Sequence, residues 1–342
     1  IKDIARLSGV GVSTVSRVLN DRPDVSEESR RRVLQVIAEY NYLPNNSARS
    51  LVRTKSDAVG LVVRGVQNPF YTGIIRAIER DLDAADFTMV MRQIGSCEDE
   101  IKCGAMMERE KRLQGIIFLG GRSDYSPADT ALLNVPFVCC SYTNTYGTLD
   151  PTKYSSVSIA DEQEAYRAVM DLAQKGHRRI AALSTDPRDW SIAQLRCSGY
   201  ARALHDLGLS LEDGEIIRAD DFTIESAYRA VTERLKRPAD FTAIFAISDD
   251  MAIGAMRALR ESGRSIPEDC SIIAIDGLTV SEYIYPMLTT LCQPTDEMGA
   301  KSVEILMSVI HGGTHRHLIL PTTLRTGQSV RDLTRRFSRV NA

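Results

Sequence analysis

The first twenty residues carry a run of mostly small, polar side chains that could hydrogen-bond to base edges and phosphates. The members of this run are Val12, Ser13, Thr14, Ser16, Arg17 and Asn20. Apolar residues alternate with them at three- and four-residue steps, which predicts a helix with one polar face. Early residues of a helix in the DNA major groove face the base edges, so Val12, Ser13 and Arg17 are predicted to read bases. The other three are predicted to contact mainly phosphates.

A second, shorter apolar pattern precedes this helix. Ile4, Ala5 and Leu7 form an apolar stripe, and Gly9 stands where a tight turn between two helices needs a positive φ. The small side chain of Ala5 suits two helices that cross closely. This is the layout of a helix-turn-helix, for which a plain helical hairpin in a core is the alternative.

A third helix is predicted to complete the head, with Ser26 as its N-cap, acidic residues in its first turn and Pro44 after its end. The whole segment resembles the LacI/GalR family of bacterial repressors. The residues that carry the resemblance are Thr14-Val15-Ser16-Arg17-Val18-Leu19-Asn20, Val25-Ser26, Tyr42-Leu43-Pro44-Asn45 and Ala48-Arg49-Ser50-Leu51. The resemblance implies a homodimer that binds double-stranded operator DNA.

Residues 45–56 have the composition of a linker, but the resemblance implies that they contain a hinge helix. Its expected DNA contacts are Asn46, Ala48, Arg49 and Leu51, and Leu51 would wedge into the minor groove at the operator's centre. The segment Asn46–Arg53 is too short to form a stable helix alone, so we expect it to become helical on DNA. A flexible tether without DNA contact is the alternative.

The net charge of −3 hides an asymmetry along the chain. Residues 1–56 hold ten Lys and Arg against six Asp and Glu, a net charge of +4, and the rest holds 32 against 39, a net charge of −7. A basic head on an acidic body suits DNA binding at one end. The N-terminus predicts a charged helix rather than a signal peptide, and the seven cysteines lack CxxC spacing. We therefore expect reduced thiols and a cytoplasmic, nucleoid-associated protein.

From residue 57 onward, short apolar runs alternate with longer amphipathic stretches, and this alternation occurs twice. It predicts an α/β core of two doubly wound parallel-sheet subdomains that face a ligand cleft, behind an all-α helix-turn-helix head. Similarity to the family extends through Gly176-His177-Arg178-Arg179-Ile180, Ser248–Gly254 and Leu288–Pro294 and implies a type I periplasmic-binding-protein fold. The expected domains are a head (1–44), a hinge (45–56), an effector-binding and dimerisation core (57–332) and a C-terminal tail (333–342).

The resemblance also implies a small polar effector, a sugar above all, that controls operator affinity from the cleft. The matching positions are Phe70, Arg196, Phe222, Ser248 and Asp276. Arg196 and Asp276 are predicted to close on one ligand from opposite subdomains, while core packing is the alternative for both phenylalanines. The chain departs from the family pattern at Ala160, where Asp is common, at Ser248, where Asn is frequent, and at Gly277, where a second Asp is usual. Arg64, at the end of the first core strand, is unusual and would add a positive charge to the cleft.

Other chemistries have weaker signals in the sequence. No P-loop, GxGxxG, HExxH or nucleophile-elbow motif occurs, and Gly120-Gly121 fits a turn better than a phosphate loop. His315 and His317 have no third ligand at metal-binding spacing, and Asp249-Asp250 fit helix N-capping better than acid–base catalysis. We therefore predict no catalytic residues, metal or cofactor. A solute-binding protein and a sugar-processing enzyme on a similar core are the alternatives to a repressor.

Overall fold

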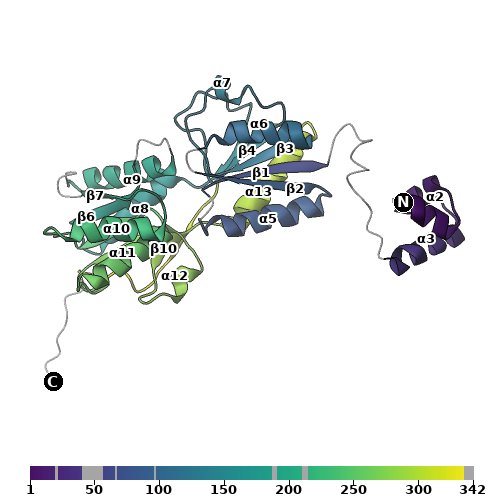
Figure 1. The fold of residues 1–342 in the computed structure, drawn as a ribbon. Helices are drawn as coiled ribbons and strands as arrows, with labels where there is room; N and C mark the ends of the chain where they lie inside the picture. Colours follow the sequence, from purple (N-terminus) through teal and green to yellow (C-terminus); the bar gives the residue numbers. More distant parts are fainter. Residues whose placement is uncertain are drawn as a thin grey trace. The chain divides into compact units, whose positions relative to one another are not determined.

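The computed structural model describes most of the chain, in seven segments: 1–19, 22–40, 57–65, 68–95, 98–186, 191–209 and 215–334. The chain divides into two compact units, residues 1–56 and residues 57–342 (Figure 1). The predictions for Asn20 and for the hinge residues Asn46, Ala48, Arg49 and Leu51 lie outside the described residues.

The first unit contains the three predicted helices, α1 (Lys2–Ser8), α2 (Val12–Leu19) and α3 (Glu27–Glu39). Their shared core is formed by apolar residues spaced along each helix: Ile4, Ala5, Val15, Val18 and Val33. Gly9 ends α1 with a φ of +66°, as the turn requires, and the Ser29 amide donates a 3.4 Å hydrogen bond to the Ser26 side chain. The helix-turn-helix prediction is confirmed.

The first sheet of the second unit is fully parallel, in the order β11-β5-β4-β3-β1-β2. Its strands are β1 (Ala58–Arg64), β2 (Thr88–Ile94), β3 (Gly115–Leu119), β4 (Phe137–Cys140), β5 (Ser155–Ser158) and β11 (His317–Ile319). In Figure 1, α6 (Glu100–Lys111) covers one face, and α5 (Tyr71–Ala84) and α13 (Thr295–Ile310) cover the other. Cys139 and Cys140 face opposite apolar clusters, as expected for a strand that is buried on both faces.

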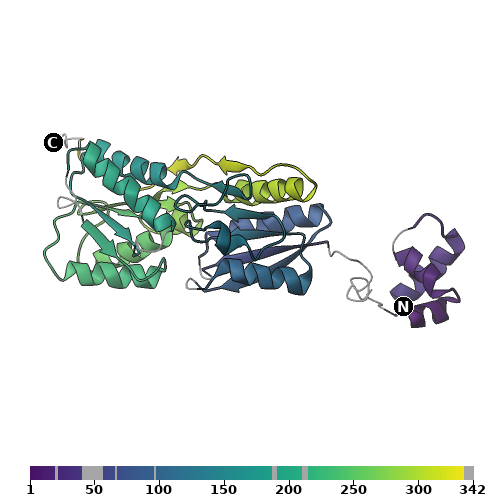
Figure 2. The same ribbon diagram turned by 90° about the horizontal axis from the view of Figure 1, so that it is seen from above.

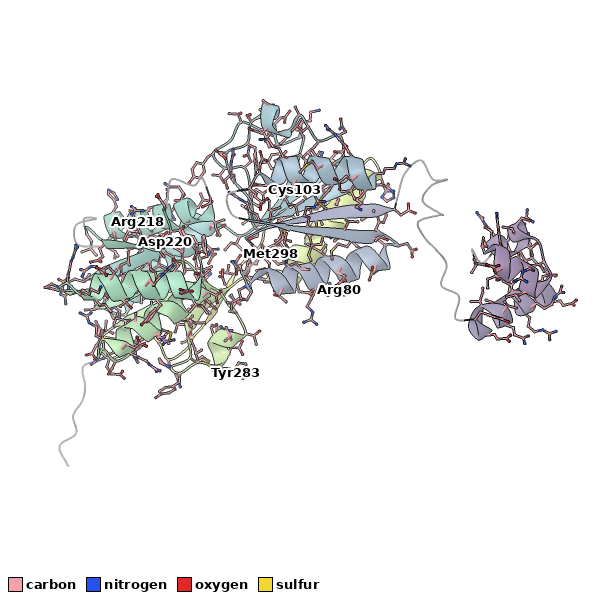
Figure 3. All side chains as sticks on the ribbon, viewed as in Figure 1. Arg80, Cys103, Arg218, Asp220, Tyr283 and Met298 are labelled. Carbon is pink, nitrogen blue, oxygen red and sulfur yellow. The ribbon has the colours of Figure 1, made fainter. Side chains whose placement is uncertain are left out.

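Helices α5 and α13 pack together on that second face. Met298, near the start of α13, is buried in the apolar core, and the Arg80 guanidinium donates a 2.8 Å hydrogen bond to the exposed Asp296 carboxylate (both Arg80 and Met298 are labelled in Figure 3). Gly299 allows this close packing, because a Cβ there would lie 2.6 Å from the Ile74 carbonyl oxygen. A short helix, α7 (Pro127–Thr130), lies between β3 and β4 in the sequence.

The second sheet has the order β12-β10-β9-β8-β6-β7, and only the β10–β12 pair is antiparallel. Its strands are β6 (Ile180–Ser184), β7 (Glu215–Arg218), β8 (Ala243–Ala246), β9 (Ser271–Asp276), β10 (Thr289–Cys292) and β12 (Thr323–Arg325). Its helices are α8 (Asp161–Gln174), α9 (Ile192–Asp206), α10 (Ile224–Leu235), α11 (Asp249–Glu261) and α12 (Val280–Tyr283). Each sheet with its helices forms one subdomain.

The chain passes between the two subdomains three times: after β5, after β10 and after β11. The C-terminal segments, yellow in Figure 2, therefore lie beside elements that come much earlier in the sequence. The predicted core of two doubly wound subdomains is confirmed, with an antiparallel β12 added at one edge. No helix within the described segments is long and apolar enough to cross a membrane.

Candidate functional site

The recognition helix α2 has a buried face toward the other two helices and an exposed face. Val15 and Val18 are buried against α1 and α3, whereas Val12 is 44% exposed and Ser13 and Arg17 are also exposed. The Arg17 guanidinium lies 3.5 Å from the Asp24 carboxylate, an exposed pair of the kind that contributes little to stability. The three predicted base readers therefore point to solvent, while Thr14 and Ser16 are half-buried.

A cavity of about 450 Å³ lies between the subdomains of the second unit, at the carboxyl ends of the parallel strands. The first subdomain contributes Arg64, Tyr71, Tyr142 and four glycines to its wall, and the second contributes Ile192, Phe222 and Asp250 among others. Ile192 of the second subdomain also packs against an apolar cluster of the first. The volume is in the range of small-molecule sites.

Of the five predicted effector residues, Phe222 lines this cavity and the other four do not. Phe70 is 4% exposed and belongs to the apolar core of the first subdomain, while the next residue, Tyr71, reaches the cavity. Ser248 caps α11 by accepting a 3.3 Å hydrogen bond from the Met251 amide. Arg64, singled out for its charge, does line the cavity.

Arg196 and Asp276 are brought together, but not in the predicted way. Both belong to the second subdomain, Arg196 on α9 and Asp276 at the end of β9, so the prediction of opposite subdomains is wrong. The Arg196 Nη1 atom lies 3.5 Å from Asp276 Oδ1, and the guanidinium also donates to the Asp161 carboxylate (2.8 Å) and the Ile247 carbonyl. Gln293 donates a 2.8 Å hydrogen bond to Asp276.

This ion cluster is almost completely shielded from water, with exposures of 1% for Arg196, 4% for Asp161 and 5% for Asp276. Burial raises the pKa of both carboxyls, although Arg196 opposes the rise. Burial disfavours the charge on Arg196, but the two carboxyls raise its pKa above the usual value. The family pattern commonly has Asp at the position of Ala160. In this chain the next residue, Asp161, supplies the carboxylate instead.

The local structure explains why this chain has Gly277 where the family pattern has a second Asp. This residue has a φ of +79°, and a Cβ on it would lie 2.6 Å from the Cα of Cys292. A side chain at this position would collide with the backbone of β10, so the second Asp of the family pattern does not fit here.

The adjacent residues Asp249 and Asp250 point in different directions. Asp249 accepts hydrogen bonds from the Leu278 amide (2.7 Å), the Ser281 hydroxyl (2.7 Å) and the Thr290 hydroxyl (2.5 Å). Asp250 faces the cavity instead. Ser248 is the N-cap of α11, so the capping role expected for the aspartates is wrong. Asp250, like Tyr71, Tyr142 and Ile192, lines the cavity without having been predicted as an effector residue.

The two histidines near the C-terminus serve the fold. His315 Nδ1 lies 2.9 Å from the Ser155 hydroxyl, and His317 Nδ1 lies 2.8 Å from the Ser156 hydroxyl. These contacts join the segment around β11 to β5.

Comparisons with known proteins agree with this architecture. Residues 1–45 match the family of bacterial regulatory proteins, lacI family, and residues 169–330 match the periplasmic binding protein-like domain. The HTH-type transcriptional regulator MalR of Clostridium butyricum is 39% identical over 327 residues, which cover 95% of this chain and 97% of that protein.

Two solved structures are similar over nearly the whole chain. The lac repressor dimer bound to operator and the anti-inducer ONPF has a TM-score of 0.82 at 26% identity and covers 96% of this chain and 98% of its own. The transcriptional regulator CelR in complex with cellobiose has a TM-score of 0.69 at 30% identity and covers 95% and 98%. This chain therefore belongs to the LacI family of bacterial transcriptional regulators.

Proposed function

We propose that this protein is a homodimeric repressor whose affinity for a pseudo-palindromic operator is controlled by a sugar bound in the cavity between its core subdomains. The observation that carries the proposal is the combination of an exposed recognition helix with a cavity of about 450 Å³ at the strand ends, whose lining includes both aromatic and charged side chains. The relatives support each part: the lac repressor is solved as a dimer on its operator, and CelR is solved with cellobiose. Such a protein would act on the nucleoid, in the cytoplasm.

The cavity suits a sugar better than an apolar ligand. Phe222 offers a flat apolar surface for the face of a sugar ring. Each subdomain also contributes a charged side chain to the cavity wall, Arg64 from the first and Asp250 from the second. A sugar that contacts both subdomains would favour one relative arrangement of them, and this preference would be transmitted to the two heads through the hinges. The relatives named above are transcriptional regulators, not solute-binding proteins or enzymes.

The test is a screen of maltose, cellobiose, glucose and ribose for thermal stabilisation, followed by operator binding with and without the sugar that stabilises. A ligand present at about 100 times its dissociation constant adds roughly 2.7 kcal/mol to the free energy of unfolding. We expect at least one sugar to raise the melting temperature and to change operator affinity. Turnover of a sugar, or stabilisation without any change in operator affinity, would contradict the proposal.

Arg17→Ala is expected to weaken operator binding by about 1–3 kcal/mol and to relax specificity at one base pair, because it removes a side chain predicted to read a base edge. The operator is first obtained by selection from random duplexes, and affinity is then measured at fixed salt for the operator and for single-base variants. Arg6→Ala is the control, because Arg6 is an exposed arginine on α1 outside the recognition helix. Equal loss of base discrimination in both variants would reject the assignment of Arg17.

Leu51→Ala is expected to reduce the ratio of specific to non-specific DNA affinity and to reduce DNA bending. The reason is the proposed hinge helix: alanine keeps helix propensity but removes the side chain that would unstack the central base step. Leu51→Gly, which also weakens the helix, should have the larger effect. Dimerisation and sugar binding are measured in parallel and should be unchanged. Normal bending by both variants would show that the segment is only a tether.

A further inference from the structure

Asp250 is a buried carboxylate for which the described segments supply no partner. The residue is 8% exposed, it lines the cavity, and its Oδ1 atom is inaccessible to solvent and accepts no hydrogen bond from any described residue. No cation of the described chain forms an ion pair with it. Burying a charged group without a partner is costly, so such groups in proteins are normally paired or hydrogen-bonded.

The fold does not need Asp250 at this position. Ser248 already caps α11, and Asp249 already binds the loop after β9 and strand β10 through three hydrogen bonds. A negative charge in the first turn of a helix is favourable, but Asp249 also supplies one. What distinguishes Asp250 from its neighbour is its position on the cavity wall, where its charge acts on a bound ligand.

The other charged groups of the cavity are already engaged. Arg64 Nε lies 3.7 Å from the Oε2 atom of Glu100, which is 1% exposed, so this cation has a buried counter-charge within its own subdomain. Asp221 accepts hydrogen bonds from the amide (2.9 Å) and the hydroxyl (2.5 Å) of Thr223. The described lining of the cavity therefore carries more negative than positive charge, from Asp221 and Asp250 against Arg64.

We propose that Asp250 is a specificity-determining residue of the effector site, which accepts hydrogen bonds from hydroxyl groups of a neutral sugar and excludes sugars that carry a phosphate or carboxylate. The proposal rests on the sugar-responsive function proposed above. An ionised carboxylate only accepts hydrogen bonds, which suits a ring hydroxyl that reaches the part of Asp250 exposed to the cavity. The same charge repels an anionic substituent in a site of low dielectric constant.

Asp250→Asn tests the proposal, because the amide keeps the shape of the side chain and removes its charge. The dissociation constants of maltose, cellobiose, glucose and ribose, and of glucose 6-phosphate and glucuronic acid as anionic probes, are measured by calorimetry for the full-length protein. Asp220→Asn is the control, because the Asp220 carboxylate is exposed and does not line the cavity. Thermal denaturation of each variant shows that it is folded.

We expect the neutral sugar that wild type binds best to lose about 10- to 100-fold in affinity in Asp250→Asn, as for loss of a hydrogen bond to a charged group. The preference for neutral over anionic sugars should also fall at least tenfold, a change that a purely structural role would not produce. Asp220→Asn should change the affinity for the neutral sugar and the preference for neutral sugars less than threefold.

If Asp250→Asn binds the sugars with the same affinities and the same preference for neutral sugars as wild type, this proposal is overturned. The proposed function then remains intact. Tighter binding of an anionic sugar than of any neutral sugar by wild type would do the same. If no sugar binds wild type, the proposed function fails, and the role of Asp250 fails with it.

Discussion

Arg196→Met is expected to lower the free energy of unfolding of the second unit by about 3–5 kcal/mol, the range seen when one partner of a buried ion pair is removed. The change would leave Asp161 and Asp276, both about 95% shielded from water, without the cation that they share. Methionine fills a similar volume, so lost charge compensation dominates over the cavity that the change creates. The single Trp of the chain, residue 190, belongs to this unit, and its fluorescence during urea denaturation is the measurement.

Arg202→Met is the control for this prediction, because Arg202 lies on the same helix and is also ion-paired. Its partner is Glu162, and both side chains are 40% exposed, so we expect a loss of about 0–1 kcal/mol. The loss of free energy of unfolding in Arg196→Met should be smaller at pH 5 than at pH 8. At the lower pH, the Asp161 and Asp276 carboxyls, which no longer have their cation, can take up protons. Similar losses in the two variants would mean that the buried cluster does not stabilise the core.

The sequence predicted most elements because its apolar runs are continuous where a strand is buried on both faces. The apolar run Gly115–Leu119 predicts a strand there, which is β3, and the amphipathic stretch Asp296–Ile310 predicts α13, which begins one residue earlier, at Thr295. The short elements β7, α7, α12, β10 and β12 were not predicted. Strand β10 is buried but begins with two threonines, and β12 is an edge strand of only three residues. Neither strand has an apolar run long enough to be recognised.

The site was harder to predict than the fold, because small offsets decide which side chain reaches a cavity. Successive residues of a helix differ by about 100° in direction, so Phe70 points into the core and Tyr71 into the cavity. The subdomain membership of Arg196 and Asp276 depends on which strands pair, information that periodicity does not contain. Asp250 could not be distinguished from Asp249 by sequence alone, since the difference lies in the hydrogen-bond donors that the loop after β9 and strand β10 bring to only one of them.

Because the described residues supply three hydrogen bonds to Asp249 and none to Asp250 Oδ1, we expect opposite effects of Asp249→Asn and Asp250→Asn on the free energy of unfolding. Asp249→Asn should lower the free energy of unfolding by about 2–3 kcal/mol, because its amide nitrogen would face a donor wherever it is placed. The Oδ2 atom of Asp249 accepts from Leu278 and Ser281, and its Oδ1 atom accepts from Thr290. Urea denaturation followed by tryptophan fluorescence measures the loss.

Asp250→Asn should instead leave the ligand-free protein as stable as wild type or stabilise it by about 1–3 kcal/mol at pH 7.5. Burial, with a smaller contribution from the charge of Asp249, raises the pKa of Asp250 from 3.8 to about 6. A carboxyl with a raised pKa in the folded state costs no stability below pH 4 and its full penalty above about pH 6.

The advantage of Asp250→Asn over wild type should therefore shrink towards zero between pH 7.5 and pH 4.5. Asp276 titrates nearby and the charge of Asp250 raises its pKa, so the difference between the two proteins at each pH reports the titration of Asp250 together with this coupling. A destabilisation like that of Asp249→Asn, independent of pH, would show that the protein satisfies Asp250 by itself and that no ligand is needed to do so.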